Sequence, residues 1–431
     1  MTQAQPKPLS VVMLTPLDYL SAFNNREHNA IRYYRGQGDH VVLIGKKLNR
    51  RPGMAAALRD GLTCRIERAE RDGAEIRLCD PFLNFFGGIA KQSKAQAASE
   101  AKPSLTGRIK ARLISVLKPL SLLRELAAVA SQLVAAWGPA GRADLVMGFG
   151  PWGALPGLLL KYLGRANCLV YVDRDYEAGL FDDQRGRITA ALERKLPQKS
   201  DIFVTIGPRL QKLRLETTGR EPLLCETGVT AANFAAAHGA SPASGQVEIL
   251  YVGNVIEWSG VELVIRAMGE LPARLRFRVI GSGLPGYMNE LAALAESLGV
   301  ADRVEFVGPI AHVELPGAMA GASLGFAASR PNLYRQYAYP LKVLEYMAAG
   351  LPVLATKDTE AADIVARAQA GFSFDYDVTA LRDALDRLLA QPQLLTQMRT
   401  NALAAAQGMS WERSFDRERG AIMDQLRGQV G

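Results

Sequence analysis

The chain has 431 residues, of which 48% are hydrophobic and 22% are charged. This composition excludes disorder or a coiled coil as the dominant state, and the length predicts two domains of about 200 residues each. The net charge of +8 allows an anionic partner, whether nucleotide, phospholipid or nucleic acid, without choosing among them.

The cysteines and the apolar runs of the sequence indicate in which part of the cell the protein is expected. The four cysteines are far apart, with no Cys-x-x-Cys pair, and only four histidines are present, so we expect no structural zinc site and a reduced, cytosolic protein. The first 16 residues lack the features of a secretion signal. No run of about 18 apolar residues occurs, so no transmembrane helix is expected.

Short β-branched segments alternate with helical patterns, which predicts an α/β fold with parallel sheets. Strands are predicted in the first half at 10–16, 40–45, 144–150, 167–173 and 201–207. Strands are predicted in the second half at 247–254, 275–283, 303–310, 323–329 and 352–356.

Gly, Ala, Ser and Pro accumulate over residues 225–246, which indicates a domain boundary. We therefore predict two tandem Rossmann-like domains at 1–225 and 226–410, followed by an amphipathic helix at 411–431. A helical insertion is expected at 85–140.

Within this insertion, residues 104–137 combine helical apolar spacing with five basic residues. One interpretation is a helix that packs on its own domain, and the other is an interfacial helix against anionic lipid. Nucleic-acid binding is disfavoured, because no aromatic platform or recognised module accompanies the basic residues.

The stretch YPLKVLEYMAAGLPVLAT, residues 339–356, sets two charges into an apolar segment. Pro340 suits a first helical position, so we predict a helix over 341–349 with Lys342 and Glu345 on one side. A helix N-terminus with a lysine at the carboxyl edge of a parallel sheet can hold an anion, and a carboxylate one turn deeper can accept the hydroxyls of a ribose. The alternative is a solvated Lys–Glu pair on a surface helix.

Gly281, Gly283 and Gly286 have the G-x-G-x-x-G spacing after a predicted strand and before a predicted helix. A dinucleotide site would also need an acid about 20 residues on, at the end of the next strand, whereas Glu305 lies inside that strand. The motif is therefore interpreted as a turn close to a phosphate in preference to an NAD site.

Asp173 and Asp175 follow a hydrophobic strand as an Asp-x-Asp pair. Three interpretations are open: a metal site, a general base at the carboxyl end of a strand, or a residue that caps the following helix or is otherwise structural.

Four segments of the second half resemble the GT-B nucleotide-sugar glycosyltransferases of the family 4 type and their bacterial polysaccharide-assembly relatives, namely 226–234, 249–268, 279–310 and 339–356. The likeness is strong over 226–411 and weaker over 10–45 and 169–207, and residues 85–140 match nothing recognised. It implies a cleft between two Rossmann-like domains, a nucleoside diphosphate sugar bound mainly by the second, and a last helix that crosses back to the first.

The resemblance also assigns roles to residues. It implies ribose binding by Glu345 and phosphate binding by Lys342. Asp173 or Asp175 is implied as the base for the acceptor hydroxyl. Further positions near the donor are implied for Gly253, Asn254, Ser282, Gly283, Pro309, Ile310 and Arg330.

The chain departs from the family pattern twice. The family pattern has two glutamates with seven residues between them, and Tyr337 stands at the position of the first. Asn254 and Ser259 stand where a basic pair is usual. Arg330, Arg335 or Lys342 is expected to supply the positive charge instead. These departures favour the polysaccharide-assembly branches, some of which invert the anomeric centre.

The expected protein is thus a metal-independent glycosyltransferase without a cofactor. It would move a sugar from a UDP-linked donor to a lipid-linked or polysaccharide acceptor in bacterial surface glycan synthesis, at the inner face of the cytoplasmic membrane. The alternatives are a nucleotide-sugar epimerase of the same fold, a non-catalytic membrane-associated partner of a glycan assembly and, on the glycine motif alone, an NAD-dependent oxidoreductase.

Overall fold

The computed structural model describes residues 7–20, 25–47, 64–80, 120–137, 142–181, 183–238 and 245–428. The chain divides into two compact units. The first comprises residues 1–206, 211–224 and 417–431, and the second comprises 207–210 and 225–416. The chain thus returns to the first unit at residue 417, inside the last helix, whereas the predicted return to the first domain begins at 411.

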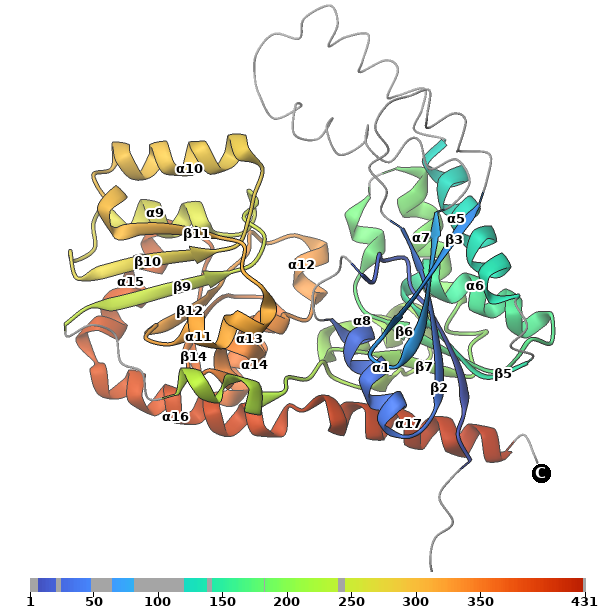
Figure 1. Ribbon diagram of the computed structural model, residues 1–431. Helices are drawn as coiled ribbons and strands as arrows, with labels where there is room; N and C mark the ends of the chain where they lie inside the picture. The colour runs from blue at the N-terminus through green and yellow to red at the C-terminus, as the bar shows by residue number, and fades with distance from the viewer. Residues whose placement is uncertain are drawn as a thin grey trace, which may run out of the picture. The chain divides into compact units, whose positions relative to one another are not determined.

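The first unit contains an eight-stranded sheet in the order β3-β4-β2-β1-β5-β6-β7-β8, in which only the edge strand β3 is antiparallel to its neighbour (Figure 1). Its strands are β1 (Ser10–Leu14), β2 (His40–Lys46), β3 (Arg65–Arg71), β4 (Ala74–Asp80), β5 (Ala143–Phe149), β6 (Ala166–Asp173), β7 (Ile202–Thr205) and β8 (Leu223–Leu224). The central strands are apolar and buried, as expected of a parallel sheet with both faces covered.

The hairpin β3–β4 is absent from the predicted elements. An Asp-Gly turn with positive φ at Asp72 and Gly73 joins the two strands. Because β3 is charged and mostly exposed, it lacks the apolar pattern by which the other strands were recognised.

The helices of the first unit are α1 (Arg26–Gly36), α5 (Leu120–Ala136), α6 (Gly150–Tyr162), α7 (Gln184–Lys195), most of α8 (Pro208–Thr218) and the end of α17 (Trp411–Gly428). Helix α5 packs on β2, β4 and α6, and Gln132 Nε2 donates to the Thr15 carbonyl at 2.7 Å. The described part of the insertion therefore packs on its own unit, and residues 85–119 lie outside the described residues.

Buried charges attach the end of α17 to the first unit. Arg26 forms an ion pair of 2.6 Å with Glu418, and Arg419 pairs with the buried Asp39. A buried pair that loses one member leaves the other charge uncompensated, so these contacts hold α17 in one register on α1 and on the loop that follows α1.

The second unit contains a fully parallel sheet in the order β11-β10-β9-β12-β13-β14. Its strands are β9 (Val247–Val252), β10 (Leu275–Ile280), β11 (Val304–Gly308), β12 (Leu324–Ala327), β13 (Val353–Thr356) and β14 (Gly371–Phe374). The strand order reverses between β9 and β12, which is where open α/β sheets bind ligands, beyond the carboxyl ends of the strands.

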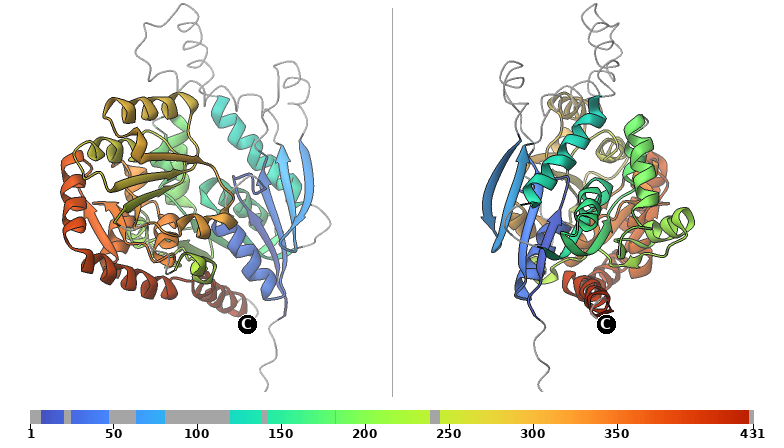
Figure 2. Two further views of the ribbon diagram at one scale, coloured as in Figure 1. Left: turned by 60° about the vertical axis from the view of Figure 1, so that its left-hand side comes forward. Right: turned by 90° about the vertical axis from the view of Figure 1, so that its right-hand side faces the viewer.

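Two apolar cores pack on this sheet, and the helices that contribute to them can be followed in Figures 1 and 2. One contains α9 (Val261–Met268), α10 (Pro285–Ser297) and α15 (Val378–Ala390), and the other contains α11 (Leu315–Met319), α13 (Leu341–Ala348), α14 (Glu360–Ala368) and α16 (Pro392–Gly408). The short α12 (Leu333–Tyr337) precedes α13. The predicted fold class, two tandem doubly wound α/β domains, is confirmed.

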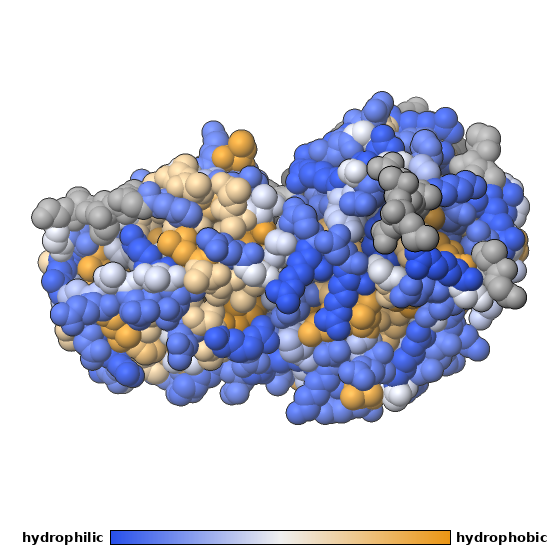
Figure 3. All heavy atoms as spheres, turned by 90° about the horizontal axis from the view of Figure 1, so that it is seen from below, coloured by the Kyte–Doolittle hydropathy of each residue, from blue (hydrophilic) through white to orange (hydrophobic). Residues whose placement is uncertain are grey.

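On the face of Figure 3, hydrophilic side chains surround smaller groups of hydrophobic ones in both units. Among the described helices, none is both long and apolar enough to cross a membrane.

Candidate functional site

Two glycine turns meet at the carboxyl ends of β9 and β10. Gly253 and Gly281 have φ values of +132° and +143°, and a side-chain carbon added to Gly281 would overlap the Gly253 carbonyl. Gly283 pairs with Val255, whose carbonyl leaves no space for a side chain at Gly283. The first two glycines of the motif are therefore required by close backbone approach.

The third glycine of the motif is different. Gly286 lies in α10, and nothing lies within 4 Å of the position of an added side-chain carbon. In a dinucleotide fingerprint the third glycine permits close packing of helix on strand. Gly286 has no such role, which argues against the dinucleotide interpretation of this motif.

Helix α13 brings its lysine to these turns. The helix begins at Leu341, and Pro340 is its N-cap, so the prediction that Pro340 occupies the first helical position is wrong by one residue. Lys342 Nζ lies 3.1 Å from the position of a side-chain carbon added to Gly253. It also lies 4.2 Å from the centroid of the Tyr251 ring. The cation is therefore held beside the turn at the end of β9.

Glu345 lies one turn deeper on α13 and is nearly buried, with 8% of its side chain exposed. His312 Nε2 lies 2.7 Å from Glu345 Oε1. Because an ionised carboxylate only accepts, the imidazole N–H is the donor. His312 follows the half-buried Ile310 by two residues, in the loop after β11. Glu345 is thus paired with His312, and Lys342 lies over Tyr251, whereas the surface interpretation required a pair between Lys342 and Glu345.

Tyr346, the next residue of α13, connects the two strands at the point where the strand order reverses. Its hydroxyl accepts the Val252 N–H of β9 at 2.7 Å and donates to the Phe326 carbonyl of β12 at 3.4 Å. The fully buried ring packs on Gly325, where a larger residue would clash. One short helix therefore carries both charged side chains and the residue that ties the sheet beneath them.

The remaining predicted donor residues lie around these turns. Asn254 is exposed and its carbonyl accepts the Tyr251 hydroxyl at 2.7 Å. Ser282 is exposed and its carbonyl accepts the Val255 N–H at 2.9 Å. The exposed Arg330 follows β12, and its N–H donates to the Trp258 carbonyl at 2.9 Å, so its backbone is fixed to the β9–α9 loop.

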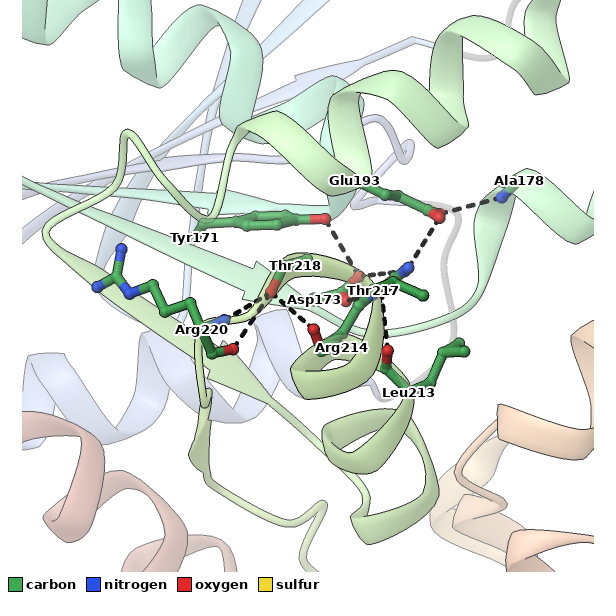
Figure 4. Close-up of polar contacts among 9 residues, drawn as sticks. All are labelled: Tyr171, Asp173, Ala178, Glu193, Leu213, Arg214, Thr217, Thr218 and Arg220. Carbon is green, nitrogen blue, oxygen red and sulfur yellow. Dashed lines mark hydrogen bonds and ion pairs between the residues drawn. The ribbon is translucent and has the colours of Figure 1, made fainter.

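In the first unit, Asp173 at the end of β6 is fully buried (Figure 4). Its Oδ2 lies 2.5 Å from Arg214 Nε, and the Tyr171 hydroxyl donates to its Oδ1 at 3.2 Å. Arg214 Nη1 also lies 3.0 Å from Glu193 Oε2. Burial lowers the pKa of Arg214, but the carboxylates of Asp173 and Glu193 outweigh it and raise the pKa above its usual value. Asp173 therefore has the structural role of an ion-pair partner, and it caps no helix, since Asp183 caps α7.

Asp175 lies two residues further on and is half-buried. The adjoining Glu177 places its carboxylate against Gly150 at the start of α6, and burial raises its pKa to about 8 although the Arg174 guanidinium opposes the shift. Arg174 in turn pairs with the buried Glu27 of α1. Charged side chains thus gather at the carboxyl ends of β1, β5 and β6, beside the reversal of strand order in this sheet.

Four residues around the predicted site residues were not identified from the sequence. His312 contacts Glu345 and Tyr251 contacts Lys342. Tyr346 ties the sheet beneath them, and Arg214 pairs with Asp173. His312 and Arg214 act through residues 33 and 41 positions away. A lone histidine or arginine carries no local signal of such a contact. The Tyr346 contact follows from Gly325, which only the fold places opposite it.

Residues 246–391 match the family model described as glycosyl transferases group 1. A D-inositol 3-phosphate glycosyltransferase of Xylanimonas cellulosilytica is 29% identical over 167 residues, which cover 38% of this chain and 39% of that protein. The chain thus spans about two fifths of the length of the curated relatives it matches.

Solved structures match over nearly the whole chain. HepE of Anabaena, in complex with UDP, has a TM-score of 0.67 at 16% identity and covers 96% of this chain and 100% of its own. WaaG, a glycosyltransferase involved in lipopolysaccharide biosynthesis, has a TM-score of 0.58 at 18% identity and covers 96% and 99%. The two units define the GT-B class of fold. Residues 246–391 match the group 1 glycosyl transferase model, in agreement with the resemblance stated from the sequence.

Proposed function

We propose that the protein is a glycosyltransferase that uses a nucleoside diphosphate sugar, with UDP as the nucleotide. The observation that carries this proposal is the placement of Lys342 and Glu345 one turn apart on α13, with the cation beside the Gly253 turn at the sheet's reversal point. The diphosphate would lie at Lys342 and the α13 N-terminus, and the ribose at Glu345. HepE, solved with UDP and with UDP-glucose, supports UDP as the nucleotide.

In the proposed reaction, the acceptor oxygen forms a bond to the anomeric carbon while the bond from that carbon to the diphosphate oxygen breaks. The acceptor proton passes to a carboxylate, for which the half-buried Asp175 replaces the fully buried Asp173 as our candidate. Lys342 and the helix N-terminus stabilise the charge on the departing diphosphate, so we propose that no metal cofactor is needed.

We propose a lipid-linked or polysaccharide acceptor at the inner membrane face, in surface glycan synthesis. WaaG, described as a lipopolysaccharide enzyme, supports this class of acceptor. The described part of α5 and the residue after it expose Leu123, Leu126, Val134 and Trp137 by about half. Apolar residues of this kind, next to the basic segment that precedes them in the sequence, suit peripheral contact with anionic lipid.

Calorimetric titration with UDP, GDP and ADP tests the donor assignment. We expect UDP to bind most tightly, and Glu345→Ala to weaken it by roughly tenfold or more. Unchanged binding in Glu345→Ala would show the assignment to be wrong. Incubation with UDP-sugars alone then separates an epimerase, which converts the donor without acceptor, from a transferase. Failure to bind any nucleotide would favour a non-catalytic partner.

A further inference from the structure

His312 is the one hydrogen-bond partner of the Glu345 carboxylate within the part of the chain that the structure describes. The histidine is about one third exposed, whereas the carboxylate is nine-tenths buried. A buried carboxylate without a donor is costly, and this imidazole supplies the donor from a different βα loop. The contact therefore joins the loop after β11 to α13 at the carboxylate.

We propose that His312 is a positioning residue for the ribose of the donor nucleotide, and that it sets the preference for ribose over deoxyribose. The inference rests on the proposed function, because it concerns the same nucleotide site. His312 touches Glu345 and acts through it. The structure assigns Oε1 to the imidazole, and the carboxylate retains acceptor capacity for the hydroxyls of a ribose.

The physical argument concerns the freedom of the glutamate side chain. Glu345 has three side-chain torsions, and only a fixed carboxylate can accept from a vicinal 2′,3′-diol without loss of rotamer entropy on binding. The His312 hydrogen bond orders the carboxylate before the nucleotide arrives. Without it, the carboxylate must be ordered by the ligand, so the affinity gained from the 2′-hydroxyl falls.

The experiment measures dissociation constants of UDP and 2′-deoxy-UDP by calorimetry for wild-type protein, His312→Ala and His312→Gln. The glutamine amide can place an N–H near the position of the imidazole Nε2. We expect His312→Ala to weaken UDP by about tenfold and 2′-deoxy-UDP much less, so that the preference for ribose collapses. His312→Gln should recover most of this preference. Glu345→Gln should add little to the loss in His312→Ala, because the two residues act together.

His238→Ala is the matched control. His238 Nε2 makes a contact of the same length, 2.7 Å, to the Ala348 carbonyl at the other end of α13, and this variant should keep the wild-type preference. Wild-type protein that binds no UDP overturns the proposed function together with this inference. Wild-type protein that binds UDP, with an unchanged ribose preference in His312→Ala, overturns the inference alone.

Discussion

The ammonium of Lys342 lies 4.2 Å from the centroid of the Tyr251 ring, and the Tyr251 hydroxyl donates to the Asn254 carbonyl at 2.7 Å. The tyrosine therefore contacts both the cation and the backbone of the turn that follows β9. A cation held over an aromatic face loses less conformational freedom when an anion binds. The lysine is thus pre-positioned at the turn.

Replacing Lys342 by Met should leave the fold intact and reduce kcat/KM by roughly 10²–10³, since the cation is proposed to stabilise the departing diphosphate. Steady-state kinetics with UDP-sugar and acceptor measures the effect. Lys357→Met is the control, because Lys357 pairs with Asp375 at an exposed position of the same unit. An equal loss in both variants would contradict a specific role for Lys342.

Gly281→Ala and Gly286→Ala should differ sharply in their free energy of unfolding, although both glycines belong to one motif. At Gly281 the added carbon would overlap the Gly253 carbonyl at φ +143°, so we expect a loss of several kcal/mol and weaker UDP binding. At Gly286 the space is open and the residue is helical, so alanine should be neutral or stabilising by up to about 1 kcal/mol. Urea unfolding compares the two variants. A destabilising Gly286→Ala would revive the dinucleotide interpretation.

Asp173→Asn and Asp175→Asn should separate stability from catalysis. Asp173→Asn leaves the buried Arg214 with one anionic partner fewer, so we expect a loss of about 3–5 kcal/mol in the free energy of unfolding. Asp175→Asn should cost less stability than Asp173→Asn, because Asp175 is half-buried, and should lower kcat by about 10²-fold or more. Chemical denaturation and single-turnover kinetics measure the two effects. Full activity in Asp175→Asn would remove it as the base.

The stability of the first unit should depend on pH through Glu177. Burial raises the pKa of its carboxyl to about 8 in the folded protein, above its unfolded value near 4.5. Between these values the folded state binds more protons than the unfolded state, so this group's contribution to stability falls as pH rises from about 5 to 8. Glu177→Gln should remove that fall. Relative to the wild-type protein at the same pH, the variant should therefore be more stable at pH 9 than at pH 5. Glu216→Gln, at an exposed position, should leave the pH profile unchanged.

Much of the fold could be predicted because the parallel strands are short, apolar and buried on both faces. Periodicity and turn residues mark such strands without knowledge of their neighbours. The predicted elements omit β3, β4, β8 and β14. The charged side chains of β3 face solvent, β4 is its hairpin partner, and β8 has only two residues. Helix α13 was predicted to within one residue at each end from Pro340 and the Ala-Ala-Gly that follows.

The candidate site was predictable only where function is local in the sequence. Lys342 and Glu345 are three residues apart, so helical spacing alone places them on one side. Asp173 left several interpretations open, because its role depends on Arg214, which only the fold brings within 2.5 Å. The His312–Glu345 contact depends in the same way on two loops meeting beyond the sheet.

The hydrogen bond to the Tyr346 hydroxyl makes the Val252 amide a reporter of the movement of α13. The Val252 amide donates to a side chain of α13, so this amide proton exchanges with solvent only when the helix moves away from the end of β9. A ligand that engages Lys342 or Glu345 must hold the same helix in place. Slower hydrogen exchange at Val252 on addition of nucleotide would therefore record occupancy of the site without the use of an acceptor.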